Sequence, residues 1–299
     1  MQIRVANAPT SWGVEDPGDG ANPRWPQMLD DLAGAGYDGT ELGPLGYLPA
    51  DPAVLGAELA RRRLKLVGGF LFEPLHRRDS LPAVLAAARR TCRVLSAAGA
   101  EHLVIIQGFT ADRERAAGRP GVAQPLPDAD WAALIDAVHA VALLAAGDYG
   151  LTPVFHPHAG THVEFEGEID RLAADTDAGL VRLCIDTGHC AYAGFDPVGV
   201  FRRHADRVAY FHLKDVDRER LRGALARGLS FDEAVAERVF CPLGEGVVDF
   251  GALREALAEH GFEGWATVEQ DRLPTDSGTP AEHAAASLAH LRRIGLACG

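Results

Sequence analysis

Hydrophobic residues recur along the chain in short runs, each followed by a polar or glycine-rich turn and then by a longer stretch rich in Ala, Leu and Arg. The short runs have the length of strands and are apolar at consecutive positions, which is typical of strands buried on both faces. The longer stretches carry apolar residues with helical spacing, as at 83–99, 130–147 and 249–261. We therefore predict strands at residues 3–8, 37–42, 64–70, 102–108, 152–158, 181–186, 208–214 and 265–270.

Strands that alternate with helices pair in parallel, because each connection is long enough to hold a helix. Such a chain forms either a closed barrel or an open doubly wound sheet. The open sheet would carry a phosphate-binding GxGxxG motif after its first strand, and the segment NAPTSWGVEDPG has none. A chain of 299 residues is of the size that one barrel fills. The predicted fold class is α/β, a (β/α)8 TIM barrel that forms a single domain over residues 1–299.

Two segments are longer than a βα unit needs. Residues 109–129 are rich in Gly, Pro and charge and are predicted to be a long loop, whereas residues 216–247 contain an extra helical pattern. Both follow strands, so we expect both on the face where barrel enzymes build their sites. Long segments at that face serve as lids over a site or as contacts in a homo-oligomer, and the pattern leaves both roles open.

The amino-acid composition limits which classes of partner the protein is expected to bind. With 29 Lys and Arg against 42 Asp and Glu, the net charge is −13, and such a surface repels nucleic acid and anionic lipid. We see no apolar run near the roughly 20 residues of a membrane-spanning helix, and no signal-peptide core in MQIRVANAPTSWG. We expect a cytoplasmic protein with reduced thiols, because the cysteines lack any CxxC spacing: Cys92, Cys184, Cys190, Cys241 and Cys298.

Polar side chains stand at the carboxyl ends of nearly all the predicted strands. A buried strand has no reason to carry carboxylates and imidazoles, and in a barrel these ends converge around one axis. We therefore expect the polar residues to line one pocket: Glu41, Gln107, His156, His158, Asp186, His212, Lys214 and Glu269.

Four of these residues have the composition of a metal site. His156, Asp186, His212 and Glu269 supply two imidazoles and two carboxylates. Such mixed nitrogen and oxygen sets suit Mn²⁺, Co²⁺, Zn²⁺ or Fe²⁺ better than Mg²⁺ or Ca²⁺. Because no thiolate takes part, a structural zinc centre is disfavoured and positions would stay open for substrate oxygens. We expect one divalent ion, with Mn, Co and Zn as the candidates.

The carboxyl-terminal half resembles the xylose isomerase-like barrel family. The resemblance rests on HPHAGT (156–161), IDTGH (185–189), FHLKD (211–215) and TVEQD (267–271). Together with NAPTSWG near the start, these segments are most similar to inosose (2-keto-myo-inositol) dehydratases. The resemblance implies the ligands Asp186, His212 and Glu269. It also implies a departure, because His156 stands where epimerases of the family have a glutamate.

The resemblance and the strand-end pattern together suggest roles for the remaining residues. Lys214, Glu269 and Glu41 are the candidates for proton transfer, although Lys214 could instead form a salt bridge to Glu41 or Asp186. The alternative for Arg218 is a surface position, and for Trp12 it is loop packing. The candidates for holding the substrate are Trp12, Gln107, His158, His189 and Arg218.

The resemblance implies a carbon–oxygen lyase that acts on a small polyol, namely a metal-dependent dehydratase of 2-keto-myo-inositol. The alternative is a sugar or inosose isomerase or epimerase with the same metal. Epimerases of this family use two carboxylates on opposite faces of one carbon, and His156 removes one of them. The sequence therefore favours elimination, in which one base and one acid suffice. An endonuclease IV-like activity is disfavoured by the net charge of −13.

Overall fold

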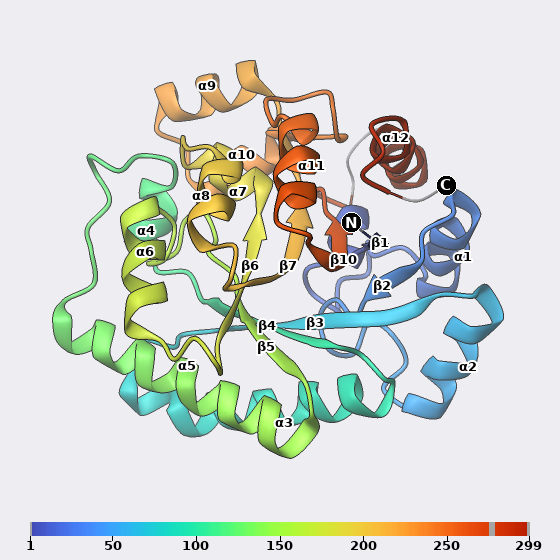
Figure 1. Ribbon diagram of the computed structural model, residues 1–299, viewed down its shortest axis with the longest axis horizontal. Helices are drawn as coiled ribbons and strands as arrows, with labels where there is room; N and C mark the ends of the chain where they lie inside the picture. The colour runs from blue at the N-terminus through green and yellow to red at the C-terminus, as the bar shows by residue number, and fades with distance from the viewer. Residues whose placement is uncertain (1, 275–278, 298–299) are drawn as a thin grey trace.

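The computed structural model describes residues 2–274 and 279–297. Eight parallel strands close into a barrel in the order β1-β10-β7-β6-β5-β4-β3-β2, which confirms the predicted fold class (Figure 1). All eight predicted strands are present, with ends that differ by a few residues. Their bounds are Gln2–Asn7 (β1), Gly39–Glu41 (β2), Lys65–Glu73 (β3), His102–Gln107 (β4), Thr152–Phe155 (β5), Arg182–Asp186 (β6), Val208–Leu213 (β7) and Glu263–Val268 (β10).

Helices surround the barrel, and most of them bury one face against it. In α3, for example, Val84, Ala88, Cys92 and Leu95 recur at helical spacing and are buried. The bounds are Trp25–Ala35 (α1), Pro52–Arg62 (α2), Leu81–Ala97 (α3), Ala111–Ala116 (α4), Asp128–Tyr149 (α5), Glu166–Asp175 (α6), Thr187–Tyr192 (α7), Pro197–His204 (α8), Arg218–Arg227 (α9), Phe231–Ala236 (α10), Phe250–Glu259 (α11) and Pro280–Arg293 (α12), with 3-10 turns at Pro9–Trp12 (η1) and Arg78–Ser80 (η2).

Helix α5 corrects one expectation from the sequence. By length and composition it could cross a membrane, with a mean hydropathy of 1.5, and half of that stretch is buried inside the protein. It packs against α3 and β5, as a covering helix of a barrel does. The helix is apolar overall because its solvent-facing side also carries hydrophobic residues, such as Leu143, which is 62% exposed.

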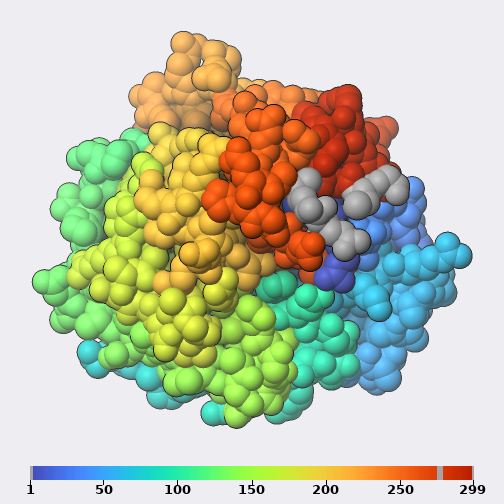
Figure 2. Space-filling view, viewed as in Figure 1, coloured from blue at the N-terminus to red at the C-terminus, as the bar shows by residue number. Residues whose placement is uncertain are grey.

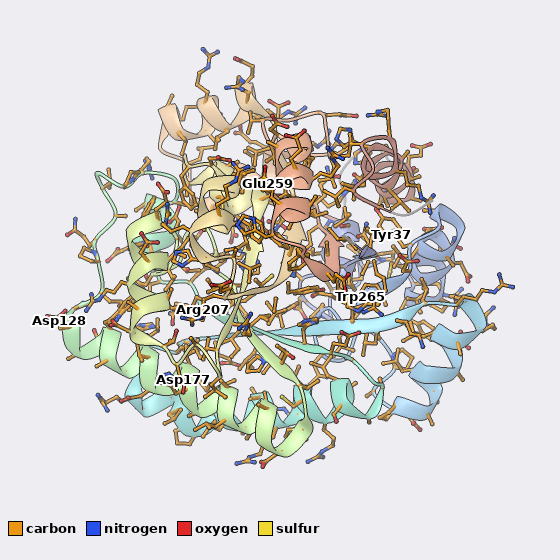
Figure 3. All side chains as sticks on the ribbon, viewed as in Figure 1. Tyr37, Asp128, Asp177, Arg207, Glu259 and Trp265 are labelled. Atoms are coloured by element: carbon orange, nitrogen blue, oxygen red, sulfur yellow. The ribbon has the colours of Figure 1, made fainter. Side chains whose placement is uncertain are left out.

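The barrel interior is apolar at the amino-terminal ends of the strands and polar at the carboxyl ends. Trp265 fills the amino-terminal end (Figure 3). Its Nε1 donates a hydrogen bond to Glu101 Oε1 over 2.8 Å, and Arg4 lies over its ring. In the strand register, Asp186 pairs with His212, and His212 with Thr267. This register places the polar ends of β6, β7 and β10 at one level.

The two inserted segments lie at the carboxyl ends of the strands, as predicted. Residues 109–129 form a loop that contains the short helix α4 and ends in the first residues of α5. Residues 216–247 contain α9 and α10, flanked by a two-stranded antiparallel sheet of β8 (Asp215–Val216) and β9 (Phe240–Cys241). Figure 2 shows α9 projecting from the body of the molecule. The insertions share a small apolar core, to which both Ala117 and Phe231 belong.

Buried polar contacts fix both insertions to the barrel. Arg113 of α4 is buried and donates hydrogen bonds to both carboxylate oxygens of Glu168, over 2.7 and 2.8 Å. Asp215 accepts hydrogen bonds from the backbone N–H groups of Val216, Gly244, Gly246 and Val248. A Cβ at Gly246 would lie 2.3 Å from Asp215 Oδ1, so the loop closes over this carboxylate only with glycine there.

The described cysteines agree with the expectation of free thiols. Cys92, Cys184 and Cys190 are buried, Cys241 is partly buried, and all four are unpaired. Cys298 lies outside the described residues.

Candidate metal centre and active site

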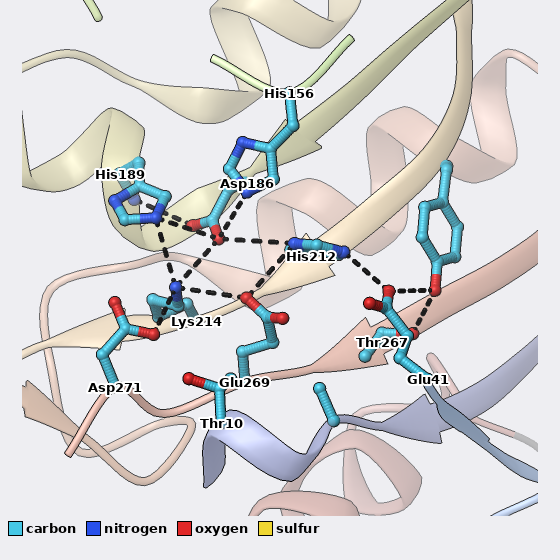
Figure 4. Close-up of polar contacts among 12 residues, drawn as sticks. Thr10, Glu41, His156, Asp186, His189, His212, Lys214, Thr267, Glu269 and Asp271 are labelled. Carbon is cyan, nitrogen blue, oxygen red and sulfur yellow. Dashed lines mark hydrogen bonds and ion pairs between the residues drawn. The ribbon is translucent and has the colours of Figure 1, made fainter. Parts of the chain in front are cut away.

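Four side chains from neighbouring strands meet at the carboxyl end of the barrel. His156 follows β5, Asp186 ends β6, His212 lies in β7 and Glu269 follows β10. One ligand atom from each lies within 4.8 Å of the others, and all four residues are buried (Figure 4). Two of the facing atoms, Asp186 Oδ2 and His212 Nδ1, are buried and make no hydrogen bond within the described part of the chain, although Lys214 Nζ and Glu269 Oε2 lie 3.3 and 3.2 Å from them. Buried polar atoms without a hydrogen bond are costly, and a divalent ion would give both a direct partner.

Hydrogen bonds outside the cluster determine which nitrogen each histidine turns inward. His156 Nδ1 donates to the carbonyl oxygen of Pro157 over 2.7 Å, which leaves Nε2 with a lone pair. His212 Nε2 donates to Glu41 Oε1 over 2.9 Å, so its Nδ1 is the inward atom. Burial lowers the pKa of His156 well below its usual value. His156 is therefore neutral at neutral pH, the form in which imidazole binds metals.

Glu41 lies behind His212 and belongs to a buried network. Its Oε1 accepts hydrogen bonds from the Tyr210 hydroxyl over 2.6 Å and from His212. The Tyr210 hydroxyl is also in contact with Thr267 Oγ1 (Figure 4). Glu41 is 1% exposed and does not line the cavity described below. This placement suits a residue that orients a ligand, and it does not suit the proton-transfer role predicted from the strand-end pattern.

Lys214 lies beside the cluster and contacts three acidic side chains. Its Nζ lies 3.3 Å from Asp186 Oδ2, 3.2 Å from Glu269 Oε2 and 2.7 Å from Asp271 Oδ1. Burial disfavours the ammonium ion, but the three carboxylates outweigh it and raise the pKa of Lys214 well above its usual value. Of the two salt bridges weighed from the sequence, the structure contains the one to Asp186.

A cavity of about 630 Å³ opens directly above the cluster. His156, His212, Lys214 and Glu269 form part of its wall. Much of the rest is aromatic, because Phe72, Phe109 and Phe231 surround the ring of His158 at centroid distances of 5.8, 5.5 and 5.2 Å. Phe109 and Phe231 come from the two insertions. The cavity is thus polar at its floor and apolar on one side.

His158 is a neutral member of this wall. Burial lowers its pKa to about 3, and its Nδ1 donates to the carbonyl oxygen of Ala159 over 2.8 Å. Its Nε2 is then a hydrogen-bond acceptor. His189 lies next to it, with ring centroids 3.8 Å apart, and its Nε2 accepts from Lys214 Nζ over 3.2 Å. The backbone N–H of His189 donates to Asp186 Oδ1 over 2.8 Å, so His189 contacts the site through both Lys214 and Asp186.

Three predicted substrate-binding residues lie elsewhere. Gln107 is buried and hydrogen bonded to the backbone N–H and Nδ1 of His76 and to the carbonyl oxygen of Gly108. Trp12 is buried in η1 within the main core. Arg218 is exposed in the first turn of α9, because the chain turns outward after β8 and Asp217 caps the helix. These positions match the alternatives to substrate binding that the sequence left open, namely a surface position for Arg218 and loop packing for Trp12.

Five polar residues of the cavity wall were not predicted from the sequence: Thr10, Glu15, Asp232, Asp271 and Arg272. Asp232 lies in α10, and the others lie in the short segments after β1 and β10, where no periodic pattern marks which side chains turn inward. The signal that could have found Asp271 is its spacing, since two residues separate equivalent sides of an extended chain and Glu269 is a candidate ligand.

Comparisons with known proteins agree with this architecture. The family described as xylose isomerase-like TIM barrel matches residues 29–294. An inosose dehydratase of Geobacillus kaustophilus is 35% identical over 275 residues, which cover 91% of this chain and 88% of that protein. The rhizopine catabolism protein MocC of Rhizobium meliloti is 35% identical over 311 residues, covering 100% of this chain and 90% of that protein.

Solved structures share the fold at low sequence identity. The crystal structure of IOLI protein with a binding zinc atom has a TM-score of 0.74 at 14% identity and covers 98% of each chain. The probable 3-DHS dehydratase AsbF from Bacillus anthracis has a TM-score of 0.73 at 13% identity, covering 98% of this chain and 99% of that one. By the family match and the sequence identity, the chain belongs to the xylose isomerase-like TIM barrel family and, within it, to the relatives of inosose dehydratase.

Proposed function

We propose that this chain is a metal-dependent dehydratase that removes water from a keto-polyol, with 2-keto-myo-inositol as its substrate. The observation that carries the proposal is the buried His156, Asp186, His212 and Glu269 cluster, with Lys214 beside it at the floor of one cavity. The identity of 35% with an inosose dehydratase over 91% of the chain supports the choice of reaction and substrate.

The four clustered residues would hold one divalent ion. Asp186 Oδ2 and His212 Nδ1 face one another without a hydrogen bond in the described part of the chain. A set of two imidazoles and two carboxylates suits Mn²⁺, Co²⁺ or Zn²⁺. When bound, such an ion polarises a ketone and offsets the negative charge that builds on its oxygen. His156 would enter the set as a neutral donor. His212 would first give up a proton, because burial is outweighed by Cys184, Glu269 and Glu41, which raise the pKa of His212 well above its usual value. Pro157 O and Glu41 fix the orientation of the two rings.

Two groups of the chain can manage the protons of an elimination. Lys214, whose ammonium form is stabilised by three carboxylates, would donate a proton to the β-hydroxyl as it leaves as water. Glu269 lies in the cavity wall. Burial alone would raise its pKa, but His212 and Lys214 outweigh burial and lower the pKa, so the carboxylate is ionised. Glu269 would accept the α-proton. Glu41 is proposed to orient His212 and to take no part in proton transfer.

The cavity wall would hold the ring of the substrate. Phe72, Phe109 and Phe231 present an apolar surface of the kind that packs against the C–H face of a ring. The acceptor Nε2 of His158 would bind a ring hydroxyl on that side. His189 is proposed to support Lys214 and to leave direct contact with the substrate to His158.

An activity assay tests the proposal directly. The protein loaded with Mn²⁺, Co²⁺ or Zn²⁺ is mixed with 2-keto-myo-inositol, and the ultraviolet absorbance of the unsaturated product and the loss of one water per substrate are followed. We expect elimination, and negligible epimerisation of free ketohexoses by the same sample. Rapid epimerisation without an absorbing product would reject the dehydratase and favour the epimerase.

The variant His156→Glu restores the carboxylate that epimerases of the family have at this position. We expect it to retain the ion and to gain epimerisation activity, because a second base now faces the substrate. The expectations of a cytoplasmic location, of a homo-oligomer and of one continuous domain over residues 1–299 stay predictions.

A further inference from the structure

Asp271 is the acidic partner of Lys214 that lies outside the candidate ligand cluster. It follows β10 by three residues and lines the cavity, and its side chain is 13% exposed. Its Oδ1 lies 2.7 Å from Lys214 Nζ, which is the shortest of the three carboxylate contacts described above. Figure 4 shows it approaching Lys214 from the side away from His212.

The other two carboxylates around Lys214 are candidate metal ligands. The oxygens that face the ammonium group are Asp186 Oδ2 and Glu269 Oε2. Asp186 Oδ2 also lies 3.7 Å from His156 Nε2 and 3.9 Å from His212 Nδ1, so it is oriented toward the cluster. A metal ion bound there would compete with the Lys214 ammonium group for the Asp186 and Glu269 carboxylates. The ion and the ammonium group would also repel each other, because both are cations.

The surroundings of Lys214 limit where its ammonium group can move. A Cβ at Gly188 would lie 2.5 Å from Lys214 Cγ, so the backbone of α7 closely abuts the stem of the side chain. The ring of Phe240 lies 5.2 Å from Nζ, and His189 Nε2 accepts from it over 3.2 Å. These groups occupy the other sides of the ammonium group. If Asp186 and Glu269 bind a metal ion, Asp271 is the contacting carboxylate that still offers Lys214 its full negative charge.

We propose that Asp271 is a positioning residue that holds the Lys214 ammonium group when Asp186 and Glu269 engage the metal ion. Lys214 takes the place of the ion in balancing these two carboxylates, and binding of the ion leaves Asp271 as the carboxylate that holds Lys214. Ion binding and placement of the lysine are thus one coupled event. The coupling rests on geometry alone, whereas its use in catalysis rests on the proposed role of Lys214 as an acid.

A double-mutant cycle on metal affinity tests the coupling without any assay of turnover. The variants are Asp271→Asn, Lys214→Met and the two combined, each titrated with Zn²⁺ and Mn²⁺ against a fluorescent chelator. With Lys214 present, we expect Asp271→Asn to weaken binding more than tenfold, because the displaced lysine has no carboxylate to join. In the Lys214→Met background the same change should cost less than threefold.

Equal losses in both backgrounds would overturn the proposal, because Asp271 would then act through its own charge or through the fold. The matched control is Glu15→Gln, which alters another acidic residue of the same cavity wall, and it should change metal affinity less than threefold. Thermal unfolding of each variant shows whether it is folded, and Asp271→Glu, which keeps the charge, should restore most of the metal affinity.

Turnover supplies the second arm of the experiment. Fully metal-loaded Asp271→Asn should have a kcat at least tenfold below that of the wild type at an unchanged KM, with partial recovery in Asp271→Glu. A raised KM at unchanged kcat would instead make Asp271 a substrate-binding residue and overturn the positioning role. If the wild-type protein does not dehydrate the keto-polyol, the proposed function fails, and the metal-affinity cycle still decides the coupling.

Discussion

The orientation of His212 depends on Glu41, a carboxylate that does not line the cavity. Glu41 accepts a hydrogen bond from Nε2 of His212 and another from the hydroxyl of Tyr210. Partners of this kind keep a ligating imidazole in one tautomer and raise its basicity, and their loss commonly lowers metal affinity 10- to 100-fold. The proposed centre therefore extends one layer deeper into the barrel than its ligands.

Replacing Glu41 with Gln tests this layer. We expect metal affinity to fall about 10- to 100-fold, because the neutral amide is a weaker acceptor and no longer stabilises charge on the imidazole. The measurement is competition with a chelator. Tyr210→Phe, which leaves the contact between Glu41 and His212 in place, should have a smaller effect, and undiminished affinity in Glu41→Gln would show that His212 needs no such partner.

Loss of the Lys214 amine separates chemistry from metal binding. We expect Lys214→Met to lower kcat by about 10²- to 10⁴-fold, the usual contribution of a positioned general acid. The content of bound metal should stay at one ion per chain, measured by elemental analysis. A variant with near-wild-type turnover would leave Lys214 with the role of a structural salt-bridge partner.

Sequence periodicity brought out the cluster because its members stand at or just after strand ends that face one axis. The same pattern also selected Glu41 and Gln107, which end β2 and β4. It could not show that Glu41 turns toward Tyr210 and Gln107 toward His76, because those partners lie on other segments. Asp271 escaped prediction for the opposite reason, since it reaches Lys214 from irregular chain.

Secondary structure elements were predictable where burial imposes a period. All eight barrel strands and the helices α3, α5 and α11 lie at the expected places. The insertions were less predictable, because their apolar residues pack on each other: Ala117 and Phe231 belong to a core that neither segment forms alone. Helix α4 has only six residues, too few for a helical period to show among Gly, Pro and charged neighbours.

The loop that follows β9 owes its shape to one carboxylate. We expect Asp215→Ala to lower the free energy of unfolding by about 1–3 kcal/mol, because four backbone N–H groups lose their acceptor. Urea unfolding measures the change. The control Asp217→Ala removes the N-cap of α9, an exposed contact to Arg220 N, and should cost about 1 kcal/mol or less; equal losses would contradict the assignment.

For the chain as a whole, buried histidines predict sensitivity to acid. Burial lowers the pKa of His156 and His189 well below their usual value and that of His158 to about 3, against about 6.5 in an unfolded chain. Below pH 6.5 the unfolded state therefore binds protons that the folded state does not. Their contribution to stability is present above pH 6.5 and is lost as the pH falls toward 3.

Each of these histidines should lower the free energy of unfolding by about 1.4 kcal/mol per pH unit below roughly pH 6. Urea unfolding at pH 7.5, 6.5 and 5.5, with a chelator present to keep the imidazoles free of metal, measures the slope. His158→Asn should remove one histidine's share of it. Burial raises the pKa of the Glu15 and Glu164 carboxyl groups to about 7, which adds a slope of opposite sign, so the comparison with His158→Asn is the deciding measurement. An unchanged slope in that variant would show that the folded protein protonates His158 without cost.

The origin of the cavity wall has a consequence for how such a protein could change over evolution. The candidate ligands stand at the ends of barrel strands, whereas Phe109 and Phe231 stand in the two inserted segments. Inserted segments tolerate substitution and changes of length far better than strands do. New sequences at 109–129 and 216–247 can therefore alter which ring is accepted while the reaction chemistry is inherited intact, so that one catalytic apparatus can diversify into enzymes for different polyols.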